Sequence, residues 1–167
     1  QERLGKLSGG VAIIKVGAPT ESAQKELKQR VEDAVAATKA AMEEGIVPGG
    51  GIALLNITLK RNLPSKTEMP VAIAAMKIMS KALRSPIESI IENTGESVDE
   101  ILLKLQQKKN QEKSVEVARW IGFNALTNEI CNLKDNGIVD PLKVVKTAFI
   151  NAVSVASNYL TVGAAVT

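Results

Sequence analysis

The sequence has no histidine and very little cysteine or aromatic character. Among its 167 residues there are one Cys, one Trp, one Tyr and two Phe. Without imidazole, neither Ser-His nor Cys-His nucleophilic catalysis nor a histidine metal site can be built. The single Cys131 cannot form an internal disulfide and has no partner ligands for zinc. This pattern predicts no metal site and fits a reducing compartment.

Long hydrophobic runs are also absent. No apolar run approaches the roughly 20 residues that cross a bilayer, and the first ten residues, QERLGKLSGG, contain no apolar signal segment. The net charge is only +3 at pH 7, and Lys and Arg are interleaved with Asp and Glu. Few aromatics are available for bases to stack on. We therefore expect binding to neither a membrane nor a nucleic acid.

What the sequence does contain suits a globular, mainly helical protein. Hydrophobic residues make up 45% and charged residues 23% of the chain, so a buried core is available, and it must be built from aliphatic side chains. The chain begins without Met and ends on the apolar stretch TVGAAVT. We expect it to be part of a longer protein.

The first part of the chain predicts a strand followed by a long helix. Residues Val11–Val16 form a β-branched run that is closed by a glycine and a proline. Thr20 can cap the helix, and Gly45 can end it in the left-handed conformation. Apolar spacings of three and four predict one buried helical stripe. The stripe consists of Leu27, Val31, Val35, Thr38 and Met42.

The rest of the chain predicts several more helices. The glycine-rich turn at 48–51 is the expected domain boundary and leads into a helix at Ile52. Two capping-box patterns, at Ser85 and at Ser97, mark two further helix starts. The predicted segments that follow the turn are helices over 71–83, 85–95, 97–105 and 140–158, a polar loop or frayed helix end over 106–113, a strand over 115–123 and a β-prone end over 160–167.

Four features could carry chemistry, and each has an ordinary structural explanation. Asp33 lies two positions from Val31 and so points away from the predicted stripe, as a solvated helical Asp would. The run Gly49–Gly51 could approach an anion or nucleotide, but it matches neither GxGxxG nor a P-loop, and a hinge explains it as well. Asn124-Ala125 suits a turn, and Asp140 before a proline suits a helix cap. Taken singly, these features do not establish a site.

In combination, the strings that contain these features resemble the group I (GroEL-like) chaperonin family over nearly the whole chain. Between Lys60 and Val117 the resemblance is one of helix pattern and length. The matching strings are LSGGVAIIKVGAPTE (7–21), RVEDAVAATKAAMEEGIVPGGGIAL (30–54), FNALTNEI (123–130) and GIVDPLKV (137–144).

The resemblance implies a C-terminal chaperonin fragment with two parts. Residues 1–44 would be the end of the apical domain and a strand and long helix of the intermediate domain. Residues 45–167 would be the helical C-terminal half of the equatorial, ATP-binding domain. In the intact protein, this implies an ATPase that folds and refolds client proteins in a ring homo-oligomer in the cytoplasm or an organelle matrix.

The resemblance also implies site residues. Asp33 falls at the family's catalytic aspartate, which acts on the water that attacks the γ-phosphate. Gly49 and Gly50 would lie against the nucleotide, and Asp140 would accept hydrogen bonds from the ribose. The adenine would meet Asn124, Ala125 and Leu126. Leu126, Pro48 and the Lys/Gln-rich loop depart from the family's usual residues.

Some parts of the family pattern have no counterpart in this sequence. The phosphate-binding loop, the magnesium-binding aspartate and most of the apical domain, through which clients and the co-chaperonin bind, do not occur here. We therefore expect ATP and Mg²⁺ to act in the intact protein, with an isolated chain that is inactive and binds neither tightly. The alternative is a non-enzymatic helical module that binds partner proteins through exposed apolar surfaces.

Overall fold

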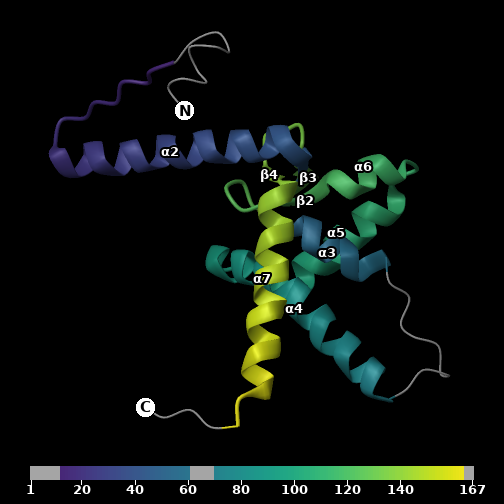
Figure 1. The fold of residues 1–167 in the computed structure, drawn as a ribbon. Helices are drawn as coiled ribbons and strands as arrows, with labels where there is room; N and C mark the ends of the chain where they lie inside the picture. The colour runs from purple at the N-terminus through teal and green to yellow at the C-terminus, as the bar shows by residue number, and fades with distance from the viewer. Residues whose placement is uncertain (1–11, 61–69, 164–167) are drawn as a thin grey trace. The chain divides into compact units, whose positions relative to one another are not determined.

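The computed structural model describes residues 12–60 and 70–163, which fall into two units divided between Lys39 and Ala40. The described residues are mainly helical, as the sequence predicts, and their order along the chain can be followed in Figure 1. The elements are α2 (Glu21–Glu44), β1 (Ile46–Pro48), α3 (Ile52–Lys60), α4 (Pro70–Thr94), α5 (Val98–Gln111), α6 (Val115–Trp120), β2 (Ile121–Asn124), β3 (Glu129–Asn132), β4 (Val139–Pro141) and α7 (Leu142–Thr161).

The first unit contains α2 as far as Lys39 and the segment before it. The predicted cap is confirmed, because the Ala23 N–H donates to Thr20 Oγ1 at 3.2 Å. The predicted strand is wrong over residues 12–16, where the chain forms no ladder, and Val11 lies outside the described residues. β-Branched residues favour an extended backbone, but a strand also needs a hydrogen-bonded partner.

The predicted buried stripe of α2 is also wrong in this structure. No residue of the helix is buried, and Met42, the last member of the stripe, is 83% exposed. Periodicity identifies which side chains share a face, whereas burial requires a second element that packs against it. The helix still ends where predicted, at Gly45, whose φ of +85° is the left-handed conformation.

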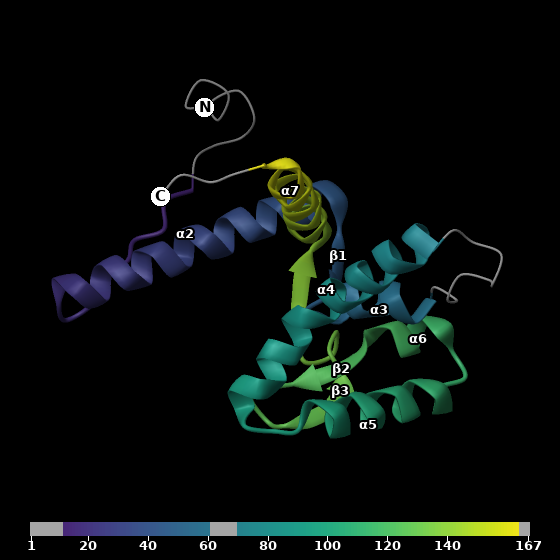
Figure 2. The same ribbon diagram turned by 90° about the horizontal axis from the view of Figure 1, so that it is seen from below.

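The second unit has one aliphatic core. It is formed where α3, the second half of α4 and α5 meet the hairpin of β2 and β3, which lies beside α5 in Figure 2. Gly122 in β2 is required by this packing, because a Cβ there would lie 2.4 Å from Leu133 Cδ1. The buried members are Ile52, Leu55, Ile87, Ile91, Ile101, Leu105, Ile121, Phe123 and Leu133.

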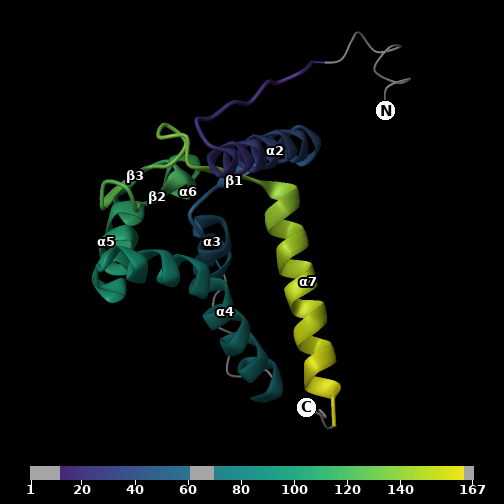
Figure 3. The same ribbon diagram turned by 90° about the vertical axis from the view of Figure 1, so that its left-hand side faces the viewer.

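Helix α4 joins two segments that the sequence predicts as separate helices. It runs without interruption through Pro86, so the predicted helix start at Ser85 is wrong, and Figure 3 shows the helix changing direction along its length. Proline removes one backbone hydrogen bond and usually breaks or bends a helix. Leu83, Ile87 and Ile91 recur every four residues across the proline and are all buried, so packing holds both halves in one helix. The predicted stop at Gly95 is confirmed by its φ of +80°.

Two predictions around α5 and α6 are partly wrong. Residues 106–111 continue α5, because Ile101 and Leu105 anchor the helix in the core below them. Residues 115–120 form the helix α6 and not a strand, and the Ser114 hydroxyl accepts from the Val117 N–H at its start. The predicted strand is correct only from Ile121, where all four residues of β2 are buried.

The last helix differs slightly from its prediction at both ends. Asp140 is not its cap, because Asp140 lies in β4 and Pro141 occupies the cap position. The helix continues to Thr161, so the predicted β-prone end is helical at Leu160 and Thr161, and residues 164–167 lie outside the described residues. Within the part of the chain that the structure describes, no helix is long and apolar enough to cross a membrane.

Candidate functional site

The glycine turn after β1 is held close to a neighbouring backbone segment. The Gly49 N–H donates to the Ile138 carbonyl at 3.1 Å, and the Gly49 carbonyl accepts from the Ile52 N–H that opens α3, also at 3.1 Å. A Cβ at Gly49 would lie 3.2 Å from the Ile138 carbonyl carbon. Gly50 has a φ of +60°. Gly49 is buried against Ile138, so the partly exposed Gly50 is the glycine whose backbone can approach a ligand closely.

Pairing between β1 and β4 brings a carboxylate to the same region. The two strands are antiparallel, with Val47 opposite Asp140. The turn also meets the end of β2, because the position of a Cβ at Gly50 lies 3.8 Å from the Phe123 carbonyl oxygen. Asn124 follows Phe123 directly. The structure therefore gathers Gly49, Gly50, Asn124 and Asp140 into one part of the second unit.

Asn124 has the turn role that its sequence context suggests. Its side-chain Oδ1 accepts a hydrogen bond from the Leu126 N–H at 3.0 Å, and the residue is only 9% exposed. The next two residues of the turn are exposed, and Leu126 reaches 93% exposure. The turn therefore presents Ala125 and Leu126 to the solvent beside a fixed asparagine.

Asp140 is a half-buried carboxylate. No hydrogen bond joins this carboxylate to another residue in the described ranges, and burial raises the pKa of the group above its usual value. The carboxylate is partly removed from water and no protein group in the described ranges donates a hydrogen bond to it. Its oxygens can therefore accept hydrogen bonds from a bound hydroxyl or amine. The chemistry of this oxygen pair suits a ligand that donates hydrogen bonds.

Asp33 lies in the other unit, exposed on α2. Its charged neighbours pair among themselves, with Lys28 Nζ 3.3 Å from Glu32 Oε1 and Arg30 at 4.0 Å from Glu26. Asp33 takes part in no ion pair with any described residue. Its assignment as a catalytic residue stays a prediction from the sequence.

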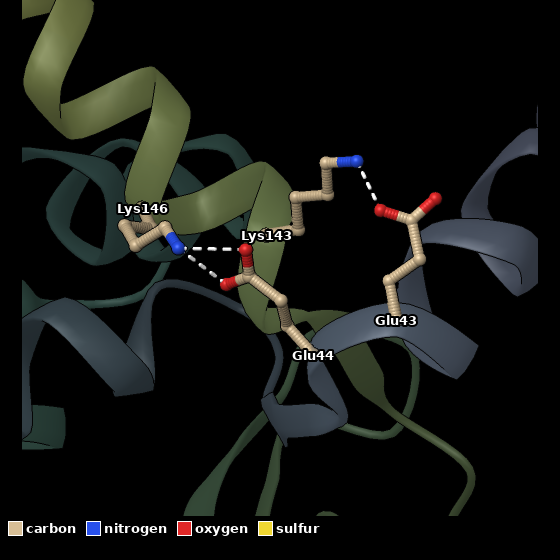
Figure 4. A network of polar contacts seen from close by, with 4 residues as sticks. All are labelled: Glu43, Glu44, Lys143 and Lys146. Carbon is tan, nitrogen blue, oxygen red and sulfur yellow. Dashed lines mark hydrogen bonds and ion pairs between the residues drawn. The ribbon is translucent and has the colours of Figure 1, made fainter.

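The structure also reveals a polar junction that the sequence analysis missed. Lys146 Nζ lies 2.6 Å from Glu44 Oε2, and Lys143 pairs with Glu43, so the start of α7 is tied to the last turn of α2 (Figure 4). The Glu43 carboxylate raises the pKa of Lys143. The partners are about 100 residues apart in sequence, with separations of 100 and 102. The only signal of this junction in the sequence was a pair of adjacent glutamates and a pair of lysines three residues apart.

The described side chains form no cluster that suits a metal ion. Across residues 12–60 and 70–163, no group of three or more Cys, Asp or Glu side chains is placed to hold an ion.

Comparison with known proteins identifies the family. The family model described as the TCP-1/cpn60 chaperonin family matches residues 4–167. The chain therefore belongs to the TCP-1/cpn60 chaperonin family. The crystal structure of a group III chaperonin in the open state is similar to it, with a TM-score of 0.74 and 28% sequence identity.

The chain spans about a third of the length of that group III chain. The match covers 95% of this chain but 32% of the group III chain. The mainly helical fold class and membership of the chaperonin family are confirmed.

Proposed function

We propose that this chain is part of an ATP-hydrolysing chaperonin subunit and forms the base and ribose side of its nucleotide site. The observation that carries the proposal is the convergence of the glycine turn, Asn124 and the half-buried Asp140 in a member of the chaperonin family. These groups come from three separate segments, 49–50, 124–126 and 140, so local turn or cap chemistry does not account for their meeting.

Each group suits a part of the nucleotide. The Asp140 carboxylate has acceptor capacity for the two ribose hydroxyls, and the backbone of Gly50, with Gly49 beside it, lets the nucleotide lie close. The turn after Asn124 offers polar backbone and the apolar surface of Leu126 to the adenine. Bound Mg²⁺ would supply charge neutralisation at the phosphates, which these residues do not contact.

Asp33 is proposed as the residue that orients or activates the attacking water. Its exposure on α2 leaves the carboxylate accessible, and phosphoryl transfer asks mainly for position and electrostatics. The motif RVEDA followed by PGGG supports this assignment and the narrower placement in group I. We also propose the domain division of 1–44, intermediate and apical, and 45–167, equatorial.

The same proposal extends to the partners of the intact subunit. Ring assembly with copies of itself would use surfaces that are partly absent from this chain, and capture of unfolded clients and a co-chaperonin would use the missing apical domain. The intact protein would refold clients in the cytoplasm or an organelle matrix. The proposal of these partners rests on family membership, and the match to 32% of the group III chain is consistent with a longer subunit.

The role of Asp33 is tested by Asp33→Asn in the intact subunit. We expect ATP binding and ring assembly to persist while the hydrolysis rate falls by about a hundredfold or more, because only the transition state uses this carboxylate. Steady-state phosphate release and equilibrium ATP binding measure the two effects. Glu32→Gln, which removes the adjacent exposed carboxylate, is the matched control and should leave turnover unchanged. Unaltered hydrolysis in Asp33→Asn would rule out the assigned role.

The alternative function, a non-enzymatic module that binds partner proteins, is favoured by the apolar side chains that α7 leaves exposed. Tyr159 is 78% and Leu160 84% exposed. The two functions are distinguished by Asp140→Asn in the intact subunit, which should weaken ATP binding if the chain forms part of a nucleotide site. In a protein that only binds partner proteins, this change should have no effect on ATP binding.

A further inference from the structure

One lysine is unusually enclosed where α3, α5 and α6 meet. Lys109 Nζ, from α5, donates to Asn56 Oδ1 in α3 at 2.5 Å. The Asn56 Nδ2 in turn donates to the Arg119 carbonyl in α6 at 2.9 Å. The asparagine thus fixes the end of the lysine side chain with a neutral partner, and no carboxylate pairs with this ammonium among the described residues.

The lysine lines a cavity that is open to solvent. The cavity has a volume of about 250 Å³, and Gln106, Lys109 and Arg119 are among the residues around it. None of its lining residues is acidic. A smaller cavity of about 180 Å³ adjoins it through the shared residues Asn56 and Arg119. Lys109 and Arg119 are the two cationic residues of the lining, so a small molecule with negative charge would meet positive charge there and no carboxylate.

Enclosure changes the protonation of this amine in the direction that makes it reactive. Burial lowers the pKa of Lys109 to about 8. On the same helix, the Glu100 carboxylate raises the pKa of Lys104. At pH 7.5 about a quarter of a lysine with a pKa near 8 is neutral, against about 0.1% at an ordinary pKa. Only the neutral amine is a nucleophile.

We propose that Lys109 is a covalent modification site, where its amine is acylated by small acyl phosphates that enter the cavity while Arg119 attracts their phosphate group. The neutral Nζ attacks the carbonyl carbon and forms the new C–N bond. The bond from that carbon to the phosphate oxygen breaks, and phosphate leaves with the electron pair. The proton lost from nitrogen passes to water, and the product is a neutral amide. No oxidant or metal is required.

The site is tested by exposing the native protein to acetyl phosphate at pH 7.5 and following acetylation of each lysine by peptide mass spectrometry. We expect Lys109 to react at least about tenfold faster than Lys104, after allowing for the lower intrinsic nucleophilicity of a less basic amine. The advantage should disappear in concentrated urea, where both side chains are solvated. Equal native rates for the two lysines would overturn the proposal.

The role of Arg119 is tested separately with Arg119→Gln, compared between acetyl phosphate and the uncharged donor p-nitrophenyl acetate. Acylation of Lys109 by the phosphate donor should slow by about threefold or more, since the guanidinium no longer attracts the anion, whereas the uncharged donor should react at the wild-type rate. If both donors slow equally, or neither slows, Arg119 does not recruit the phosphate.

Discussion

Among single residues, Asp140 is the one whose proposed role in nucleotide binding has a measurable consequence for stability. Its carboxylate is half-buried beside the glycine turn, and burial raises its pKa. A group held in this way costs folding stability when it is charged, and such costs are typical of residues kept for binding. The cost has a definite pH dependence, because the folded state holds the proton more tightly than the unfolded state does.

Replacing this carboxylate should therefore stabilise the protein at neutral pH. Since the pKa of Asp140 is higher in the folded state, its contribution is favourable below the ordinary value of 3.8 and is lost as the pH rises through the folded pKa. Asp140→Asn removes this loss, so its free energy of unfolding should exceed that of the wild type at pH 7 but not at pH 3. Urea unfolding across this range measures the difference.

A matched control for Asp140→Asn is Asp135→Asn, which changes an exposed aspartate in the loop before β4. The change that Asp135→Asn makes in the free energy of unfolding should not show the difference between pH 7 and pH 3 that is expected for Asp140→Asn. A loss of stability in Asp140→Asn at pH 7 would contradict the prediction, because it would mean that the charged carboxylate makes a stabilising contact.

At this scale, sequence predicts local backbone features well and partnerships between distant residues poorly. The Thr20 cap and the left-handed Gly45 and Gly95 are confirmed, because each depends on residues within one helical turn. Ser97 occupies the predicted cap position, yet its side chain makes no cap hydrogen bond. The neighbourhood shared by Gly50, Asn124 and Asp140 depends on strand pairing and was reached through a family resemblance.

Among the elements, the junction of α2 with α7 is held mainly by polar contacts. The Leu142 N–H, at the start of α7, donates to the Gly45 carbonyl at 3.0 Å, next to the two ion pairs of Figure 4. The Glu44 and Lys146 side chains are 30% and 48% exposed. Water and salt therefore reach this pair, and its strength should depend on ionic strength.

A double-mutant cycle with Glu44→Gln and Lys146→Gln should give a coupling free energy of about 0.5 kcal/mol, as is typical for a partly exposed pair. The coupling should become smaller in 1 M NaCl, where the Debye length is about 3 Å. Chemical denaturation with urea at low and high salt provides the measurement. The control cycle is Glu100 with Lys104, a more exposed pair within α5, for which a smaller coupling is expected. A coupling at Glu44 and Lys146 that does not respond to salt would contradict a screened ion pair.

The errors in predicted elements have two causes, tertiary packing around Pro86 and a side-chain helix cap at Ser114. Pro86 and Ser85 form a good local start signal, but buried side chains on both sides of the proline keep α4 continuous. The alternating pattern over 115–120 suggested a strand, although Ser114 caps a short helix there. In both places tertiary packing or a single side-chain cap outweighs the local pattern.

For the whole molecule, the main feature is the apolar surface that the described chain leaves exposed. No residue of α7 is buried, and for most of its length this helix stands clear of the other helices of its unit in Figure 3. Val155, on α7, is 67% exposed, and Val71, at the start of α4, is 78% exposed. The predicted apolar faces exist, but sequence periodicity cannot say what covers them. In the longer subunit that we propose for this chain, we expect the other parts of the subunit to cover them.

The same partial coverage leads to a prediction about nucleotide binding by these 167 residues alone. The proposed site offers groups to the base and ribose, whereas tight binding of Mg-ATP depends on contacts to the phosphates and the metal. Isothermal titration calorimetry should therefore give a Kd weaker than about 1 mM for Mg-ATP. Adenosine should bind about as weakly, because both ligands use the same base and ribose contacts. Circular dichroism of the same sample checks that the helices have formed. Tight binding of Mg-ATP, with adenosine much weaker, would show that this chain does contact the phosphates and would overturn the proposed division of the site.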